Sequence, residues 1–369
     1  MTKTLIIAEK PSVALDISRA LGGFTREGDY FESEHYVLAS SIGHLLSLVA
    51  PNDPVKGKWS FAHLPVIPPA FELGPTDKKS AERLKLLVRL AKRKDVSALI
   101  NACDAGREGE LIFRYIIQFS GVSKPITRLW LQSMTQPAIR EAFANLRDDA
   151  LLKPLEAAAR SRAEADWLVG INGTRAMTAF NSKDGGFFKT PVGRVQTPTL
   201  AIVAEREERI RRFVSRDYWE VRATFVAGAG LYEGRWIDPN FKKDERDPER
   251  RESRLWSQAA AQTVVAACRN QPGSVTEEAK PSTQASPGLY DLTSLQRDAN
   301  GRFGFSAKTT LSLAQALYER HKALTYPRTD SRYLPEDYLG TVGQTMEALA
   351  DGAGLAAASL ARHARKVVD

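Results

Sequence analysis

The first 150 residues alternate between short apolar runs and longer segments with helical periodicity. TLIIAE and VSALINAC have the continuous apolar character of buried strands, and YVLASSIGHL is predicted to be a strand that runs into a loop. VALDISRAL and ELIFRYIIQF repeat apolar residues three and four positions apart, as amphipathic helices do. Strands separated by helices predict a mostly parallel sheet with helices on both faces. Ligands of such sheets bind beyond the carboxyl ends of the strands.

The remaining patterns divide the chain further. Helices are predicted over residues 78–94, 154–182 and 197–213, and strands over residues 218–236. The segment 238–254 is too charged to pack, SVTEEAKPSTQASPG has the composition of a linker, and residues 292–324 have the pattern of helix, turn and helix. We therefore expect a multidomain α/β plus α protein, with domains over residues 1–150, 151–215, 216–284 and 285–369.

Composition narrows the possible partners of the chain. The 369 residues carry a formal net charge of +8, which favours a polyanion such as nucleic acid. The sequence has no apolar window of the roughly 18 to 20 residues that span a bilayer, so no membrane association is expected. Met1 is followed at once by a strand-like run, without the pattern of a secretory signal, so a cytoplasmic location is expected. Two cysteines are too few for a zinc cluster.

Acidic residues follow two of the predicted strands. Glu9 and Lys10 end the first strand, and Asp104 and Glu108 come directly after VSALINAC. Asp104 and Glu108 share a side whether the segment is helical or extended, because they are four residues apart. Such oxygen ligands suit Mg²⁺. The alternative is a surface turn in which Lys10 and Arg107 simply pair with these acids.

Two further segments offer groups for phosphate or base contacts. In TPVGRVQTPTL, Gly193 permits close approach of the backbone, and Arg194 and Gln196 are hydrogen-bond donors. Arg162 and Asp166 share one helical face, and Arg175 lies further along the same helix. The alternatives are a loop that leads into a helix at Thr197–Pro198, and an internal salt bridge.

The segment LTYPRTDSRYL contains a candidate nucleophile. Pro327 disfavours the helical conformation at Tyr326, so Tyr326 and Arg328 are predicted on one side of an extended segment. A phenol beside a guanidinium is a nucleophile beside a phosphate clamp, and Lys10 would help to make the phenolate accessible. The alternative is a tyrosine that only packs.

Together these segments resemble one family. IIAEKPSVA, SSIGHL, INACDAGREGELIFR, ADWLVGINGTRAMT, PVGRVQTPTL, SPGLYDLTSLQRDAN and ALTYPRTDSRYL occur in the order typical of type IA DNA topoisomerases, most closely the bacterial topoisomerase III branch. The resemblance implies an N-terminal toprim domain, followed by helical and β-rich arch domains.

The resemblance also implies a mechanism. Tyr326 would attack a backbone phosphate of single-stranded DNA to give a 5′-phosphotyrosyl link, so that cleavage, strand passage and rejoining need no ATP. Arg328 would support the phosphate, Lys10 would protonate the leaving oxygen, and Glu9 would act as acid, base or metal ligand. Mg²⁺ would bind at Glu9, Asp104 and Glu108. The positions that match the family's DNA groove are His44, Arg162, Asp166, Arg175, Gly193, Arg194, Val195 and Gln196.

The chain departs from the family pattern in two ways. Gly106 replaces the middle acid of the family's DxDxE motif, and the chain is shorter than family members, with RHARKVVD resembling the approach to a later histidine-containing segment. We expect a fragment or truncated product that acts as a monomer on single-stranded or underwound duplex DNA. The alternatives are a DNA-binding remnant without strand passage, and another toprim enzyme such as a primase or nuclease, against which the YPRTD and GRVQTP segments argue.

Overall fold

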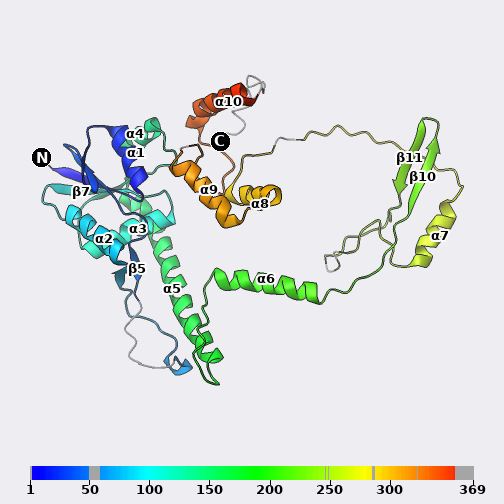
Figure 1. Cartoon of the computed structure of the whole chain (residues 1–369), viewed down its shortest axis with the longest axis horizontal. Coiled ribbons are helices and arrows are strands. Elements are labelled where there is room, and N and C mark those ends of the chain that lie inside the picture. Colours follow the sequence, from blue (N-terminus) through cyan, green and yellow to red (C-terminus); the bar gives the residue numbers. More distant parts are fainter. Residues whose placement is uncertain are drawn as a thin grey trace. The chain divides into compact units, whose positions relative to one another are not determined.

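The computed structural model describes residues 2–49, 59–245, 247, 249–284, 287–321 and 323–353, so RHARKVVD lies outside the described residues. The chain forms two compact units (Figure 1). One unit comprises Met1–Thr197 and Ser286–Asp369, and the other comprises Pro198–Ala285.

The first unit contains a seven-stranded sheet in the order β2-β3-β4-β1-β7-β8-β9. The central strands β4 (Tyr36–Ser40), β1 (Lys3–Ala8), β7 (Val96–Ala102) and β8 (Ile126–Arg128) are parallel. The outer strands β2 (Thr25–Glu27), β3 (Tyr30–Glu32) and β9 (Arg147–Asp148) are antiparallel to their neighbours. A short separate ladder joins β5 (Leu46–Leu48) to β6 (Leu73–Pro75).

Helices cover both faces of this sheet, which confirms the predicted fold class. Leu5 and Ile7 of β1 pack into one apolar cluster, and Ile6 and Ala8 pack into the other. Because both faces of β1 are buried, its sequence is a continuous apolar run without alternation. The helices whose apolar residues enter these clusters are α2 (Lys78–Ala91) and α3 (Arg107–Ser120) on the first face, and α1 (Pro11–Leu21) and α4 (Gln136–Ala144) on the second.

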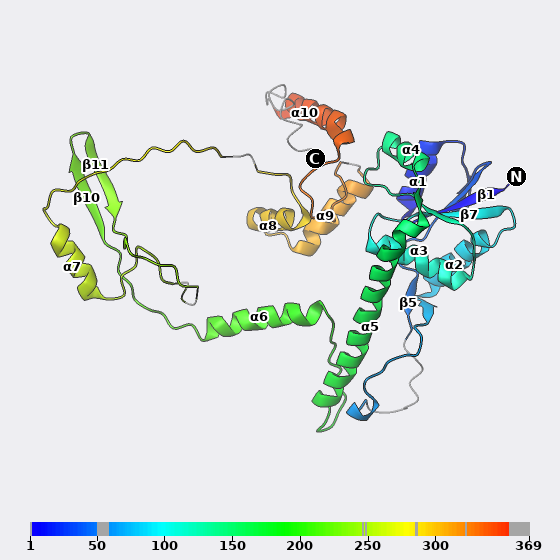
Figure 2. The ribbon, with the colours of Figure 1, turned by 180° about the vertical axis from the view of Figure 1, so that it is seen from behind.

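Helix α5 (Lys153–Asn181) is the longest helix of the described chain and follows the short turn η2 (Asp149–Leu152). It extends away from the sheet in both views of the ribbon (Figures 1 and 2). The segment around η1 (Phe61–His63) runs along it, since Asn172 Nδ2 donates a hydrogen bond to the Val66 carbonyl at 2.9 Å. The ring of Phe71 also packs edge-on against Trp167.

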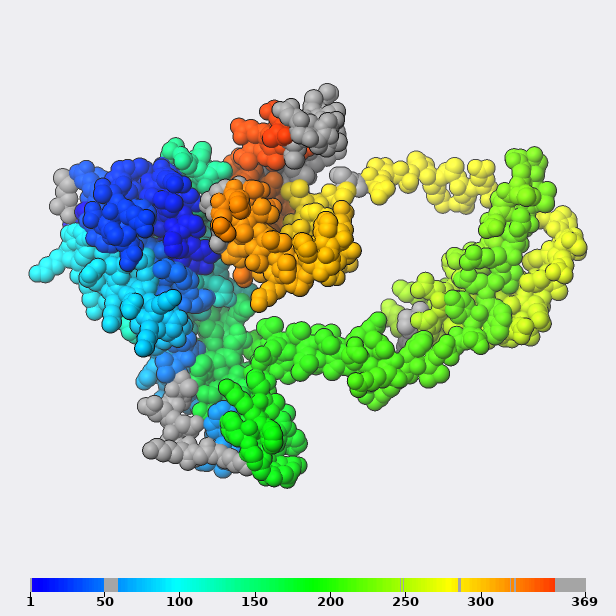
Figure 3. All heavy atoms as spheres, viewed as in Figure 1, coloured from blue at the N-terminus to red at the C-terminus, as the bar shows by residue number. Residues whose placement is uncertain are grey.

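The C-terminal part of the first unit is helical. The predicted helix, turn and helix is present as α8 (Leu292–Phe303) and α9 (Ala307–Glu319), followed by η3 (Glu336–Tyr338) and α10 (Leu339–Ala353). Gly304 ends α8 with a φ of 68°, and the Ser306 side chain caps α9. Figure 3 shows the orange surface of α9 beside the blue surface of the N-terminal residues.

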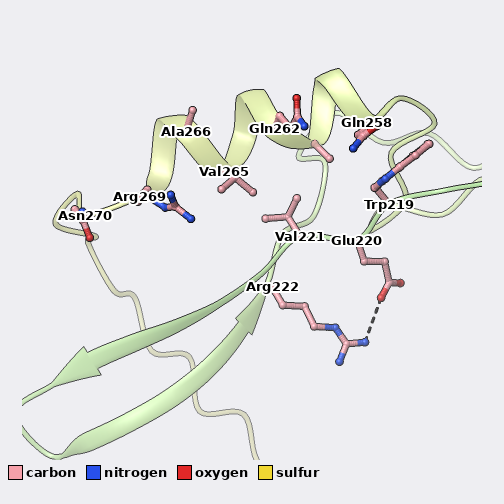
Figure 4. Close-up of a pocket in the computed structure, with 11 residues that line it drawn as sticks. Trp219, Glu220, Val221, Arg222, Gln258, Gln262, Val265, Ala266, Arg269 and Asn270 are labelled. Atoms are coloured by element: carbon pink, nitrogen blue, oxygen red, sulfur yellow. Dashed lines mark hydrogen bonds and ion pairs between the residues drawn. The ribbon is translucent and has the colours of Figure 1, made fainter.

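The second unit contains the hairpin β10 (Arg222–Ala227) and β11 (Gly230–Arg235), followed by the predicted charged loop. Helix α6 (Gln196–Arg211) begins at the boundary between the units. Helix α7 (Gln258–Cys268) was not predicted, because its alanine-rich sequence has no clear apolar stripe. A pocket of about 740 Å³ lies between α7 and residues 219–222, and none of the predicted site residues lines it (Figure 4).

None of the helices in the described part of the chain combines the length and apolar character that a bilayer span requires.

Candidate active site

The first part of the site is built at the carboxyl ends of parallel strands. Glu9 and Lys10 directly follow β1, and Asp104 follows β7. The loop after β4 lies against them, because the Gly43 N–H donates to the Glu9 carbonyl at 3.0 Å and Ser41 Oγ donates to the same oxygen at 3.1 Å. Polar residues from three strand ends therefore meet at one edge of the sheet.

Lys10 connects the two acids at this edge. Its Nζ lies 2.6 Å from Asp104 Oδ2 and 3.7 Å from Glu9 Oε1. Burial raises the pKa of Glu9, and the negative charge of Asp104 raises it further. Burial opposes the charged form of Lys10, but its hydrogen bond to Asp104 and the charges of Asp104 and Glu9 outweigh burial and raise the Lys10 pKa. The site thus holds a protonated amine beside a carboxyl group that binds a proton more tightly than usual.

A buried arginine fixes the loop that carries Asp104. Arg128 is only 1% exposed, and it donates to the carbonyl oxygens of Cys103 and Asp104, at 2.7 Å each. Its charge is balanced by Glu110, which is fully buried, with Nε and Oε2 separated by 3.4 Å. Gly109 permits this packing, because a Cβ atom there would lie 2.2 Å from the Asp104 carbonyl oxygen. The loop is therefore held from the sheet side and from α3.

Tyr326 comes from the other end of the chain to this cluster. Lys10 Nζ lies 4.9 Å from the centroid of the Tyr326 ring, and the Tyr318 ring packs against it at a centroid distance of 5.6 Å. Tyr326 is 39% exposed, so solvent and a polymer strand can reach it. Arg328 is also exposed, with Nη2 at 3.5 Å from Gln315 Oε1 of α9, the outer limit of a hydrogen bond.

The predicted convergence of three carboxylates differs from the structure. Glu108 Oε2 lies 3.5 Å from His44 Nε2, and Oε1 lies 3.1 Å from Arg162 Nη1, whereas Asp104 pairs with Lys10. Across the described residues no group of three or more His, Cys, Asp or Glu side chains is close enough to hold a metal ion. The reason is that α3 begins only at Arg107, so the segment from Asp104 to Glu108 is neither one helix nor one strand.

The residues at the strand ends nevertheless fit Mg²⁺. This ion commonly takes one or two protein carboxylates and completes its shell with water and substrate phosphate. Glu9 and Asp104 form such a pair, and the pKa of Glu9 is raised by burial and by repulsion from Asp104, a repulsion that a cation would relieve. Glu108 would first have to leave its basic partners, so its role as a metal ligand remains a prediction.

The second part of the site lies along α5. The segment after α5 returns along one face of the helix, since the N–H groups of Thr190 and Val192 donate to Thr178 Oγ1 at 2.9 Å and to Thr174 Oγ1 at 3.0 Å. Gly173 leaves room for Val192, because a Cβ atom there would approach Val192 to 2.7 Å. Residues four apart share a helical face. The returning segment therefore arrives at Asp166, where Arg194 Nη1 pairs with Oδ1 at 2.9 Å.

A row of ion pairs with alternating charges connects the strand ends to α5. Arg162 pairs with Glu108, and its Nε atom lies 4.0 Å from Asp166 Oδ2. Asp166 in turn pairs with Arg194. The side chains of these four residues are 45–58% exposed. Exposed ion pairs contribute little to stability, so a phosphate oxygen can replace a carboxylate at small cost.

The other predicted groove residues lie on the same elements. The Arg175 guanidinium is 5.6 Å from the Trp59 ring centroid, and the Gly193 N–H donates to Thr197 Oγ1 at 3.1 Å. Val195 is 73% exposed, and Gln196 is the first residue of α6.

Comparison with known proteins supports this description. The sequence profile of the Toprim domain matches residues 4–134, and the profile described as DNA topoisomerase matches residues 151–368, more than half of the chain. The chain belongs to the DNA topoisomerase family. The resemblance to type IA topoisomerases of the topoisomerase III branch is thereby confirmed, as is the N-terminal toprim domain.

Several bacterial DNA topoisomerases are similar in sequence to this chain. DNA topoisomerase 3 of Shouchella clausii is 41% identical over 351 residues, which are 95% of this chain and 46% of that protein. DNA topoisomerase 3 of Bacillus cereus strain ATCC 14579 is 41% identical over 356 residues, again 95% and 46% of the two chains. This topoisomerase-family chain therefore spans about half the length of the curated relatives it matches.

A solved structure shares the fold. The full-length topoisomerase I of Thermotoga maritima superposes with a TM-score of 0.56 at 24% identity, over 93% of this chain and 52% of that chain.

Sequence reasoning missed Arg128, Trp59 and Tyr318. Arg128 ends a strand and gave no signal, because its partners are backbone carbonyls. Tyr318 carried a usable signal, since it lies on the last turn of the helix that delivers the chain to Tyr326.

Proposed function

We propose that this chain carries out the cleavage and rejoining steps of a type IA topoisomerase on single-stranded DNA, with Tyr326 as the nucleophile. The observation that carries the proposal is the distance of 4.9 Å between Lys10 Nζ and the centroid of the Tyr326 ring. This contact brings the YPRTD segment to the acidic strand ends. Lys10 in turn bonds to Asp104, so nucleophile, amine and carboxylates form one contiguous group.

Cleavage is a transesterification. The Tyr326 Oη atom attacks a backbone phosphorus, the bond from phosphorus to the 3′-oxygen breaks, and a bond from phosphorus to Oη forms. The phenolic proton passes to a basic group, and the departing 3′-oxygen takes up a proton. One phosphodiester replaces another, so the 3′-hydroxyl can reverse the reaction without ATP.

The chain's own groups match these proton transfers. Lys10 is held protonated by Asp104 and Glu9 and is the donor to the leaving oxygen. Glu9 has a raised pKa, which brings its proton exchange closer to neutral pH. Arg328 adds positive charge for a non-bridging phosphate oxygen. When bound at Glu9 and Asp104, Mg²⁺ would supply further positive charge beside the phosphate.

The face of α5 would hold the strand that is cut. Arg162 and Arg194 exchange their carboxylate partners for phosphates, while His44 lies beside Glu108 at the end nearest the strand ends. Arg175 and Trp59 offer a cation and an aromatic ring, the combination that binds single strands without strong sequence preference. Underwound duplex DNA is the proposed source of such strands, and the bacterial relatives favour a cytoplasmic protein at nucleoid or plasmid DNA. We further propose that it acts as a monomer.

Relaxation of negative supercoils and decatenation are proposed for the complete reaction. A second candidate is a single-stranded DNA-binding remnant without strand passage, for which the exposed arginines along α5 would be sufficient. The cleavage step can be tested apart from strand passage.

The test uses an oligonucleotide labelled at its 3′ end, with Mg²⁺, followed by denaturation and gel separation of protein. A 5′-phosphotyrosyl link retains this label on the protein. We expect a labelled adduct for the wild type and for Tyr333→Phe, an exposed tyrosine of the same region, and none for Tyr326→Phe. An equal adduct yield in Tyr326→Phe would overturn the proposal. Binding that weakens steeply with salt, without any adduct, would instead support the remnant.

A further inference from the structure

The ring of the proposed nucleophile is held on two sides. Lys10 Nζ lies over the Tyr326 ring, 4.9 Å from its centroid. The Tyr318 ring meets it edge to face, with a centroid distance of 5.6 Å and an interplanar angle of 72°. This is the geometry in which the positive edge of one aromatic ring meets the negative face of another. The two contacts together restrict the plane of the Tyr326 ring.

The two tyrosines differ in how firmly their backbones are held. Tyr326 lies in an irregular segment after α9, and its side chain is 39% exposed. Tyr318 lies on the last turn of α9, whose first turn is capped by Ser306 through a hydrogen bond from the Thr309 N–H at 3.0 Å. Catalytic groups on loops need support from rigid elements if they are to stay in productive geometry. Tyr318 provides such an element beside Tyr326.

The charged side chains at the strand ends also influence the pKa of Tyr318. Burial raises the pKa of Tyr318, the positive charge of Lys10 opposes this rise, and the negative charge of Asp104 adds to it. The Tyr318 side chain is half-buried. A half-buried ring on a helix is suited to support a neighbour, whereas the exposed Tyr326 is suited to attack.

We propose that Tyr318 is a positioning residue, whose ring holds the Tyr326 ring against Lys10 and so directs the phenol oxygen toward the phosphate. The catalytic meaning of this role rests on the proposed function of Tyr326, but the ring contact does not. The contact joins the two rings, so phenylalanine at position 318 preserves it and leucine does not.

The first experiment compares Tyr318→Leu, Tyr318→Phe and the matched control Leu317→Ala, a partly exposed neighbour on the same helical turn. Single-turnover cleavage of the labelled oligonucleotide gives the rate, and a gel shift gives DNA affinity. We expect the rate of Tyr318→Leu to fall about tenfold with unchanged affinity, since loss of an aromatic contact and a small displacement of a nucleophile act together. Tyr318→Phe and Leu317→Ala keep rates within about twofold of wild type. A leucine variant as fast as wild type, or a phenylalanine variant as slow as leucine, would overturn the proposal.

The second experiment does not depend on activity. 3-Fluorotyrosine is placed at position 326, and its ¹⁹F resonance is recorded in each variant. We expect Tyr318→Leu to shift and narrow the resonance toward that of a freely rotating tyrosine, and Tyr318→Phe to leave it in place. Identical resonances in the wild type and Tyr318→Leu would refute the positioning role. If the wild type forms no adduct, the proposed function fails, while the resonance still decides whether Tyr318 holds the ring.

Discussion

The Asp337 carboxylate accepts a hydrogen bond from Thr135 Oγ1 at 2.7 Å, and thereby joins η3 to the first turn of α4. The same Oδ2 atom accepts from Ser133 Oγ, also at 2.7 Å. Thr135 is itself the N-cap of α4, so the carboxylate lies near a helix N-terminus, where negative charge is favourable. This contact links the part of the chain that carries Tyr326 to the sheet.

Replacing Asp337 by alanine is expected to loosen this link. Because Asp337 is exposed, the loss should be modest, about 0.5–1.5 kcal/mol in the free energy of unfolding. Hydrogen exchange should quicken at η3 and at the first turn of α4. Glu336→Ala, which removes the adjacent exposed carboxylate, is the matched control. Equal exchange in the two variants would contradict the link.

The lowered pKa of Glu32 leads us to expect that the protein loses stability in acid. The hydrogen bonds that it accepts from Arg93, together with the one from Lys3, lower the pKa of the Glu32 carboxyl group to about 2. A group whose pKa is lower in the folded state stabilises the protein above its unfolded pKa and loses that effect as the pH falls toward the folded value. The stability difference between wild type and Glu32→Gln should therefore be full above about pH 5 and vanish near pH 2. Thermal unfolding across this range measures it, and a difference that persists at pH 2 would contradict the assignment.

A conservative change at Arg128 is expected to lower the free energy of unfolding. Arg128→Lys keeps the charge but cannot reach the carbonyl oxygens of Cys103 and Asp104 together. Glu110, in contrast, keeps its ion pair with Arg114, with Nη2 and Oε1 separated by 2.7 Å. We expect a loss of about 1–3 kcal/mol, the range for a buried polar group left without its hydrogen-bond partner. Urea unfolding compares it with Arg89→Lys on the exposed face of α2, which should change stability by less than about 0.5 kcal/mol. Equal midpoints and slopes for the two variants would show that the Arg128 contacts contribute little.

Replacing Arg194 is expected to change the salt dependence of DNA binding. Arg194→Gln removes one proposed phosphate contact, so the slope of log K against log salt for single-stranded DNA should become shallower by about 0.7. Asp166→Asn removes the carboxylate that competes for Arg194 and should strengthen binding. Gel shifts over a salt series with mixed-sequence oligonucleotides measure both effects. Arg89→Gln is the control, and a slope that Arg194→Gln leaves unchanged would exclude Arg194 from the groove.

The sequence was sufficient where one local rule decided the structure. The apolar runs of β1 and β7 predicted buried parallel strands, and the rule for parallel sheets then brought Glu9 and Asp104 to one edge. Tyr326 lies outside a helix, as expected for a residue before proline, but α9 already ends at Glu319, so Pro327 is not what ends that helix.

The sequence was insufficient where partners come from distant segments. Glu108 pairs with His44 and Arg162, and no spacing rule within DAGREGE contains either residue. The β2–β3 hairpin was missed because β2 is exposed at every position and has no apolar pattern, while its turn depends on Gly28 with a φ of 65°.

Residues 190–194 run back along α5 and are anchored to it at three positions, so the helix acts as a spacer of fixed length. Thr178, Thr174 and Asp166 stand at multiples of four residues, and each engages a successive position of the returning segment. Adding a single residue between Asp166 and Thr174 would rotate these anchors by about 100° relative to one another, whereas adding a heptad would nearly preserve their face but carry Arg194 about 10 Å away from Glu108. The number of helical turns in α5 thus sets the distance between the Arg194 guanidinium and the Glu108 carboxylate.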